Sequence, residues 1–404
     1  MNKFGIGGST STIELAKITP KQASVKPIEL EEYKKRVLNL SQQMKAQNIV
    51  AVYLNAGANL NYFTGTHWRP SERMVGAVVL QNADVHYIAP NFEKGTIQDF
   101  MQVKGSIHCW EEHENPHLLL FKILQENGIL SGEVQVDETT PFSIIHNFLT
   151  HRNSYLITTA TSIIANCRMI KSASEIAIMQ HVMDITMEVH KAAAKILRVG
   201  ITTTEVENFI HEAHKKYGIP SGSYFCIVLF GVDSSFPHGV KNPKKLEEND
   251  IVLVDTGCQF YDYISDITRT YVFGKATEKQ ERIWNIEKET QQAAFEASIL
   301  GNTCSDIDTA ARSVLEKHHL GPDYNLPGLP HRTGHGIGLE IHEYPYLLKG
   351  NETILKPGMT FSNEPMICVP NEFGIRLEDH IYITKNGPKW FTNPAYSIYN
   401  PFGI

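Results

Sequence analysis

Apolar and polar positions in the first part of the chain follow patterns that predict a mixed α/β domain. A helical pattern over residues 30–47 (LEEYKKRVLNLSQQMKAQ) leads directly into the apolar run IVAVYLNA. The segment GAVVLQNADVHYIAP predicts a hairpin that turns at residues 82–84, and EVQVDE at residues 133–138 predicts a further strand. We therefore expect an α/β domain over residues 27–165. Residues 1–26 are rich in Gly, Ser, Thr and Lys without periodicity, which indicates an N-terminal arm that lies on the surface or is partly mobile.

From residue 166 onward the pattern changes to two helices followed by strands, and this order occurs twice. In the first half, capping boxes at Ser172 and Thr202 begin two helices, the first with apolar positions three and four residues apart. The second half repeats the order, with capping boxes at Thr277 and Ser305. Strand-like runs complete each half: YFCIVLFGV, IVLVDTG and ISDITRTYVFG in the first, and MTFSNEPMICV and GIRLEDHIYIT in the second. The pattern predicts an internally duplicated α+β domain over residues 166–404.

Length, composition and charge narrow the classes of function. A chain of 404 residues is long enough for two domains, and its hydrophobic share of 42% and charged share of 20% are those of a globular protein. A formal net charge of -7 argues against nucleic acid as a partner, because nucleic-acid binders usually carry a basic patch. No stretch approaches the ~18 apolar residues of a membrane span, and the first residues lack the apolar core of a signal peptide. We therefore expect a cytoplasmic protein that does not bind membranes.

The cysteines carry no chemistry that the sequence reveals. All six are scattered without a CxxC pair, which indicates free thiols rather than disulfides or a thiolate metal site. Cys258 in VDTGCQF invites comparison with a nucleophile, but no neighbouring residue suggests a base. We interpret it as a small apolar side chain of the core.

Four acidic residues occupy matching places in the two halves. Asp255 and Asp266 lie 83 and 94 residues after the first helix cap of their half, and Glu364 and Glu378 lie 87 and 101 residues after that of theirs. If the halves are related by a two-fold axis, matching strands meet at the centre and deliver all four acids to one site. Each acid alone is more simply explained as a solvated strand or turn residue. Matched offsets, with His335 between glycines, make that explanation weak for the set.

The surroundings of these acids indicate a pair of divalent metal ions. Asp255 ends the apolar run IVLVD, where an unpaired carboxylate would cost ~2 to 7 kcal/mol. Four carboxylates and a neutral imidazole carry a charge that two divalent ions cancel, whereas one ion would leave strong repulsion. Ligands dominated by oxygen suit Mn, Co, Fe or Zn, and two such ions ~3.5 to 4 Å apart can activate water and polarise a carbonyl together. Strand alternation places further polar residues on the faces of the acids: Thr268, Thr270, Thr360, Ser362, Arg376 and His380.

At these residues the sequence resembles a known family, which comprises prolidase, aminopeptidase P, methionine aminopeptidase and creatinase and has the pita-bread fold. VDTGCQFYDYISDITRT resembles the two-aspartate strand pair of that family, TGHGIGLEIHE its histidine segment, and SNEPMICVP with GIRLEDH its two-glutamate strands. The likeness covers roughly residues 168–384, and the preceding half is similar in architecture only. The resemblance implies a pita-bread catalytic domain preceded by a smaller creatinase-type α/β domain.

The resemblance also implies a role for each metal ligand. Asp266 and Glu378 would bridge the two ions, Asp255 would bind one ion, and His335 and Glu364 would bind the other. Glu364 would also act as the general base. We expect manganese first, with cobalt or zinc as alternatives.

Four further residues are candidates for substrate contacts. His238 in SSFPHGV matches the substrate histidine upstream in the family, and His342 in LEIHE matches the one that steadies the carbonyl oxygen and the tetrahedral intermediate. A packed histidine is the simpler interpretation of either without this motif context. His331 is a weaker third candidate. Arg376, on the strand face of Glu378, could bind a substrate carboxylate, although a structural salt bridge is a real alternative.

The loop THWRPSERM in the first half contains Trp68 and Arg69, in a position where binding residues often occur. The family likeness suggests homodimers in which the N-terminal domain covers the neighbouring active site, so that this loop limits substrate length. A solvated loop is the simpler alternative.

Cleavage of the Xaa-Pro bond in short peptides is the function that we expect, most simply by an Xaa-Pro dipeptidase. The segment TGHGIGLEIHE and the compact chain favour a dipeptidase, while aminopeptidase P and a metal hydrolase of another small amide stay open. Methionine aminopeptidases generally lack a large preceding domain, and creatinase does not retain this ligand set. A non-enzymatic binding module would be expected to lose ligands, and none is lost.

Overall fold

A computed structural model describes residues 4–21 and 24–404. The chain divides into two compact units, one of Met1–Pro27 with Met169–Ile404 and the other of Ile28–Arg168. No helix among the described residues is both long enough and apolar enough to cross a membrane. All six cysteines are free, as expected, and burial raises the pKa of the Cys258 thiol to about 11.

The smaller unit is built on a six-stranded sheet with the order β4-β3-β2-β1-β5-β6. β1, β2 and β3 pair antiparallel, and the outer pairs are parallel. The hairpin between β2 and β3 turns at Ala83, whose φ of 74° is left-handed, in the segment where the sequence predicted it. The elements are α2 (Leu30–Gln47), β1 (Ile49–Asn55), α3 (Ala58–Thr64), β2 (Gly76–Leu80), β3 (Val85–Pro90), η1 (Asn91–Glu93), α4 (Lys94–Phe100), β4 (Ser106–Trp110), α5 (Leu118–Glu126), β5 (Gly132–Val136), α6 (Phe142–His151), β6 (Tyr155–Thr159) and α7 (Thr161–Arg168).

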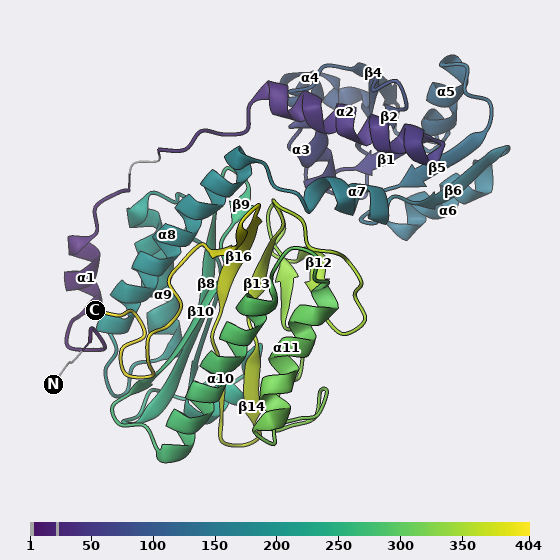
Figure 1. The fold of residues 1–404 in the computed structure, drawn as a ribbon. Coiled ribbons are helices and arrows are strands. Elements are labelled where there is room, and N and C mark those ends of the chain that lie inside the picture. The colour runs from purple at the N-terminus through teal and green to yellow at the C-terminus, as the bar shows by residue number, and fades with distance from the viewer. Residues whose placement is uncertain (1–3, 22–23) are drawn as a thin grey trace. The chain divides into compact units, whose positions relative to one another are not determined.

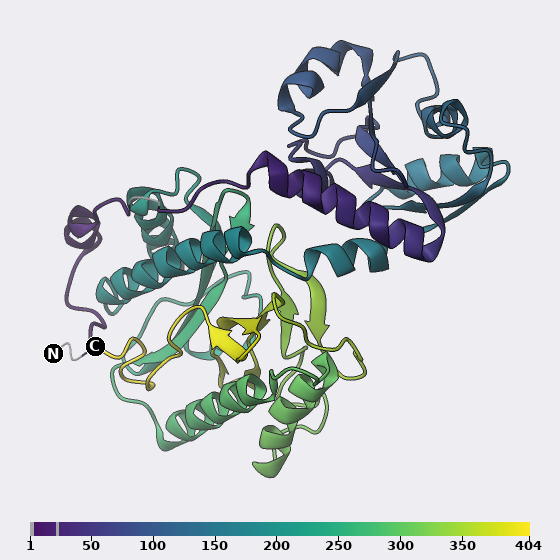
Figure 2. The same ribbon diagram turned by 45° about the horizontal axis from the view of Figure 1, so that its top comes forward.

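The larger unit contains the predicted order of two helices followed by strands, twice. Figures 1 and 2 show α8 and α9 on one side of the strands and α10 and α11 on the other. The first half contains α8 (Ala173–Lys195), α9 (Thr203–Tyr217), β7 (Ser223–Phe230), η2 (Gly231–Ser235), β8 (Asp250–Phe260), β9 (Tyr263–Ile264) and β10 (Ile267–Phe273). The second contains α10 (Glu278–Ala297), α11 (Cys304–Lys317), β11 (Gly334–Gly336), β12 (Glu343–Leu347), β13 (Thr360–Asn363), β14 (Met366–Val369), β15 (Phe373–Arg376), β16 (Asp379–Thr384) and β17 (Gly387–Trp390).

The packing of strand β8 explains why its sequence is an almost unbroken run of apolar residues. Val252 and Val254 pack into a core with α8 and α9, while Ile251 and Leu253 pack into a second core with α10 and α11. Both faces of the strand are therefore buried, and alternation places Asp255 on the face of Leu253. That face is directed toward the second half of the unit.

Capping boxes begin the main helices, and one of them differs from the prediction. The boxes at Ser172, Thr202 and Thr277 are present. The helix α11, however, is capped by Thr303 with Asp306 rather than by Ser305. The sequence TCSDID contains two overlapping capping patterns, so the local pattern alone does not choose between them.

The described part of the N-terminal arm lies against the larger unit. Its helix α1 (Ser11–Lys17) is preceded by backbone hydrogen bonds from Gly7 to Ala194 and from Ser9 to Lys195, at 2.7 and 3.0 Å. Lys21 donates a further backbone bond to Tyr217. These bonds satisfy carbonyl groups at the ends of α8 and α9.

Candidate metal centre

The four predicted acids and His335 come together where strands of the two halves meet. The Glu378 N–H donates to the Thr268 carbonyl across this junction at 3.2 Å. Asp255 lies within β8 opposite Thr268 of β10, and Asp266 immediately precedes β10. Glu364 follows β13 and Glu378 precedes β16. The junction therefore brings one pair of acids from each half into a single site.

His335 lies at the centre of this group. Its Nε2 is 3.0 Å from Glu364 Oε1 and 3.8 Å from Asp266 Oδ2, and a hydrogen bond between its Nδ1 and the Gly336 carbonyl fixes the ring. Ligand atoms of Asp266, His335 and Glu378 all lie within 4.8 Å of one another. Glycines flank His335 because β11 is confined between β12 and β13: a Cβ at Gly336 would lie 2.4 Å from the Tyr344 carbonyl oxygen.

Unpaired oxygens show that these residues fit divalent metal ions. Asp255, Asp266 and Glu378 are 7%, 4% and 1% exposed, and each has one buried carboxylate oxygen without a hydrogen-bond partner among the described residues. Leaving such an oxygen unpaired is costly, and a set of carboxylates with one imidazole suits divalent ions such as Mn, Fe, Co or Zn. The donors present, four carboxylates and one imidazole, thus suit divalent ions.

The pKa values of the acids reflect their crowding. Burial, followed by the charges of the neighbouring carboxylates, raises the pKa values of Asp266 and Glu378 well above their usual range. Burial also raises the pKa of Asp255, although the charge of Arg376 opposes the rise. Burial would raise the pKa of Glu364 too, but His335 outweighs it and holds this pKa below its usual value. A cluster of this kind is electrostatically prepared for cations.

Arg376 lies inside the site and contacts a predicted metal ligand. Its Nη2 is 2.5 Å from Asp255 Oδ2, and its Nε donates to the Thr268 hydroxyl at 3.0 Å. The same hydroxyl donates to Glu378 Oε2 at 2.7 Å. Arg376 as a whole is 3% exposed. Sequence alternation indicated Arg376 and Thr268 at this face, but it could not show that they contact each other.

The three candidate substrate histidines gather beside the acids. The His342 ring stands 4.2 Å from that of His335, and burial, followed by the charge of His335, lowers the pKa of His342 to about 4. Burial lowers the pKa of the half-buried His331. His238, in the exposed segment after η2, lies close enough to lower the pKa values of both.

Trp68 and Arg69 lie in the smaller unit, between α3 and β2. The Trp68 ring packs against Phe100 with a centroid distance of 6.0 Å, and Arg69 is exposed. Their role toward a substrate stays a prediction.

Sequence reasoning missed buried polar residues that surround the ligands. Arg269, Gln291 and Asp379 form a connected group behind Glu378, and Glu287 is fully buried on α10. Asp379 directly follows Glu378 and Arg269 directly follows Thr268, so adjacency to the site residues was the available signal. Ser362, which alternation did indicate, accepts from the His335 N–H and donates to Glu364 Oε1 at 3.1 Å.

Comparisons with known proteins give the family and the architecture of the chain. Residues 177–385 match the model of metallopeptidase family M24, and residues 36–170 match the creatinase/prolidase N-terminal domain. A putative dipeptidase, YkvY, of Bacillus subtilis is 33% identical over 87% of this chain and 96% of its own length. The Xaa-Pro dipeptidase of Pyrococcus furiosus is 31% identical over 89% of this chain and 98% of its own. The dipeptidase PepE of Mycobacterium ulcerans superposes with a TM-score of 0.84 at 28% identity, covering 91% of this chain and 97% of its own. The expected pita-bread and creatinase-type architecture is confirmed.

Proposed function

This chain belongs to metallopeptidase family M24, and from that membership we propose that it hydrolyses the Xaa-Pro bond of short peptides as an Xaa-Pro dipeptidase. The observation that carries the proposal is the group of three buried, unpaired carboxylate oxygens, from Asp255, Asp266 and Glu378, beside His335 and Glu364. The names of two relatives, a putative dipeptidase and an Xaa-Pro dipeptidase, support the substrate class.

Metal binding would use the ligands in the arrangement that the family likeness implies. Asp266 and Glu378 would bridge two ions, Asp255 would hold one, and His335 and Glu364 the other. Bound divalent ions supply Lewis acidity and lower the pKa of bound water. We propose manganese as the preferred ion.

The protein's own groups would then move protons and steady charge. Glu364, whose pKa is held low by His335, is ionised at neutral pH and can accept a proton from the attacking water. His342, with a pKa of about 4, is neutral at pH 7 and can donate one N–H to the substrate carbonyl oxygen as charge develops there. His238 would contact the substrate beside it.

A dipeptide has a free carboxylate close to the scissile bond, and two residues are available to bind it. Arg376 contacts Asp255 and Thr268 through Nη2 and Nε, and its Nη1 makes only long contacts, with the Pro237 carbonyl at 3.3 Å and with Met366 Sδ at 3.8 Å. A substrate carboxylate could replace these long contacts. His331 lies near enough to Arg376 for the arginine charge to lower the His331 pKa. A site that binds this carboxylate selects dipeptides over longer peptides. We also propose a cytoplasmic homodimer, with Trp68 and Arg69 limiting substrate length.

A substrate panel tests the proposal. Purified, metal-stripped protein would be reloaded with Mn, Co or Zn and offered an Xaa-Pro dipeptide, an Xaa-Pro-Yaa tripeptide and a Met-initiated peptide. We expect fastest turnover of the dipeptide with Mn, and Glu364→Gln should lose turnover while it still folds. Preference for the tripeptide would instead indicate aminopeptidase P. Turnover of neither proline peptide by the reloaded protein would refute proline-directed cleavage.

A further inference from the structure

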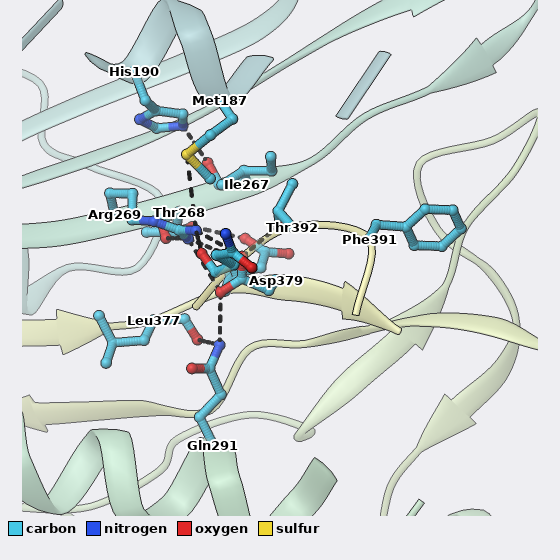
Figure 3. A network of polar contacts seen from close by, with 12 residues as sticks. Met187, His190, Ile267, Thr268, Arg269, Gln291, Leu377, Asp379, Phe391 and Thr392 are labelled. Carbon is cyan, nitrogen blue, oxygen red and sulfur yellow. Dashed lines mark hydrogen bonds and ion pairs between the residues drawn. The ribbon is translucent and has the colours of Figure 1, made fainter. Parts of the chain in front are cut away.

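Arg269 and Asp379 form an ion pair one layer behind the carboxylate ligands. Arg269 Nη2 lies 2.6 Å from Asp379 Oδ1 and Nη1 lies 3.2 Å from Oδ2, so the two groups meet at two points (Figure 3). Both side chains are 0% exposed. Burying two charges removes their hydration, and replacing such a pair by apolar residues is often neutral or stabilising. Stability of the fold is therefore a weak explanation for this pair.

Arg269 also donates to three backbone carbonyls, two of them close in sequence to the ligands, and Nη2 lies 4.0 Å from the Met187 Sδ. Nη1 donates to the Glu378 carbonyl at 2.9 Å and to the Thr268 carbonyl at 3.0 Å, two residues after Asp266. Nη2 donates to the Asn393 carbonyl at 2.9 Å. One planar guanidinium thus joins the backbone of Glu378 to that of Thr268, two residues after Asp266, and these segments belong to different halves of the unit.

Gln291 of α10 extends these contacts to a third acid. Its Nε2 lies 3.1 Å from the Leu377 carbonyl and 3.3 Å from the Asn363 carbonyl, the residues immediately before Glu378 and Glu364. The same nitrogen lies 3.3 Å from Asp379 Oδ2, and Figure 3 shows Gln291 directed at Asp379 from the helix side. Arg269, Asp379 and Gln291 are here called the Arg269 network.

The position and charge of the Arg269 network suit it to fixing distances rather than to binding cations. The charge of Arg269 is matched by Asp379, so the network changes the net charge around the metal ligands little. Four crowded carboxylates repel one another until cations are bound, so restraint of the backbone that carries them helps to keep them at ligand spacing. The halves of the unit are separated by 110 residues of sequence at this contact, so their spacing depends on such cross-links.

We propose that the Arg269 network is a set of positioning residues that holds the Asp266, Glu364 and Glu378 backbone at the spacing needed by a metal pair. The inference rests on the proposed function, because it takes these acids as metal ligands. Groups that orient ligands from one layer away typically change metal affinity or activity by 10- to 100-fold when they are lost.

Titration of the full-length, metal-stripped protein with Mn alone, followed by calorimetry and electron paramagnetic resonance, tests this inference. Arg269→Lys keeps the charge but cannot reach both carbonyls with one ammonium group. We expect its affinity for the second Mn to fall about 10- to 100-fold and the spin coupling of the Mn pair to weaken or disappear. Turnover should fall through kcat, with KM for the dipeptide nearly unchanged.

Arg312→Lys is the matched control. Arg312 pairs with the buried Asp308 at 2.8 Å and donates to three carbonyls, but none of these belongs to or neighbours one of the four carboxylate ligands. The Arg312→Lys variant should lose thermal stability, as Arg269→Lys does, but it should keep the wild-type Mn affinity and the wild-type spin coupling of the Mn pair. Equal loss of Mn affinity in both variants would reduce the effect to general destabilisation and overturn the proposal.

Gln291→Met provides a milder test if Arg269→Lys does not fold. It removes the bonds to the Leu377 and Asn363 carbonyls and leaves the ion pair intact, so Mn affinity should fall in the same direction by a smaller factor. Wild-type Mn affinity and coupling in Gln291→Met would overturn the proposal. A wild-type protein that binds a coupled Mn pair but cleaves no proline peptide would refute the proposed function and leave the positioning role standing.

Discussion

Two buried arginines near the metal centre, Arg269 and Arg376, make similar bonds and are suited to different tasks. Each pairs with an aspartate, and they are 0% and 3% exposed. Arg376 pairs with Asp255, a proposed ligand, and its charge opposes the rise in the Asp255 pKa. Arg269 pairs with Asp379, which is not a proposed ligand, and its other close contacts are with backbone carbonyls. A cation beside a ligand affects charge at the site, whereas a cation already neutralised one layer away affects mainly geometry.

Removal of either proposed bridging acid should have the largest effect on metal binding and turnover. It gives the reference with which the two arginine variants can be compared. Asp266→Asn or Glu378→Gln deletes a charge that both ions would share in the proposed arrangement, so we expect loss of the metal pair and a fall in turnover of more than about 100-fold. Metal content after gel filtration and calorimetric titration with Mn would measure this. Full occupancy by both ions in either variant would contradict the bridging roles.

Arg376→Ala should differ from the Arg269 variant in two respects: it should impair binding of the substrate carboxylate, and it should leave Mn affinity intact. Loss of a charge-assisted bond worth ~1.5 to 3 kcal/mol predicts a rise in KM of roughly 10- to 100-fold for Xaa-Pro dipeptides with a free carboxylate. Dipeptides with an amidated C-terminus serve as the control and should be nearly unaffected. Mn affinity should not fall, because a competing positive charge has been removed. An equal rise in KM for both substrates would remove the carboxylate role.

Glu287 tests what burial of a carboxyl group costs when it has no arginine partner. It is 0% exposed, and neither carboxyl oxygen makes a hydrogen bond of normal geometry with a described residue. Burial raises its pKa well above 4.5, although the Leu377 N–H and the Arg376 charge oppose this. Glu287→Leu should therefore raise the free energy of unfolding by about 1–3 kcal/mol at pH 8.

The pH dependence of that gain has a defined sign. Below pH 4.5 the carboxyl is neutral in both the folded and the unfolded state. As pH rises above 4.5, the unfolded chain releases this proton more readily than the folded protein, so the wild-type protein loses stability until the folded-state pKa is reached. The advantage of Glu287→Leu in urea unfolding should accordingly grow from pH 4.5 to pH 8. Glu287→Gln removes the titratable group but keeps a polar side chain of similar size. It therefore isolates the contribution of ionisation to the free energy of unfolding. A gain independent of pH would show that Glu287 is not ionised on unfolding in the expected way.

An exposed ion pair should show the smallest effect. Lys279 and Glu372 are 50% and 47% exposed and 2.6 Å apart, so solvent and salt screen their attraction. Lys279→Ala should change the free energy of unfolding by less than about 1 kcal/mol. This difference in the free energy of unfolding should shrink further in high salt. A larger loss that does not depend on salt would show that the exposure of this ion pair does not predict its contribution to stability.

Much of the fold follows from local sequence pattern. Helix caps at Ser172, Thr202 and Thr277 and the hairpin turn at Ala83 depend on contacts between near neighbours, and these were predicted. The N-cap of α11 was predicted at Ser305, but the structure places it at Thr303. Tertiary contacts use the alternative partners elsewhere: Asp308 binds Arg312 and Thr333, and Ser305 Oγ accepts from the Gly350 N–H.

The sequence by itself determined which residues can form the metal centre, because acids at alternate strand positions and matched offsets are a local and repeated signal. Only the tertiary structure decided what stabilises their arrangement. Arg376 contacts Asp255 from 121 residues away and Gln291 contacts Asp379 from 88, and strand alternation fixes the face of a side chain but not its partner across the sheet. The two arginines look alike in sequence, and their different roles arise from the packing of one half of the unit against the other.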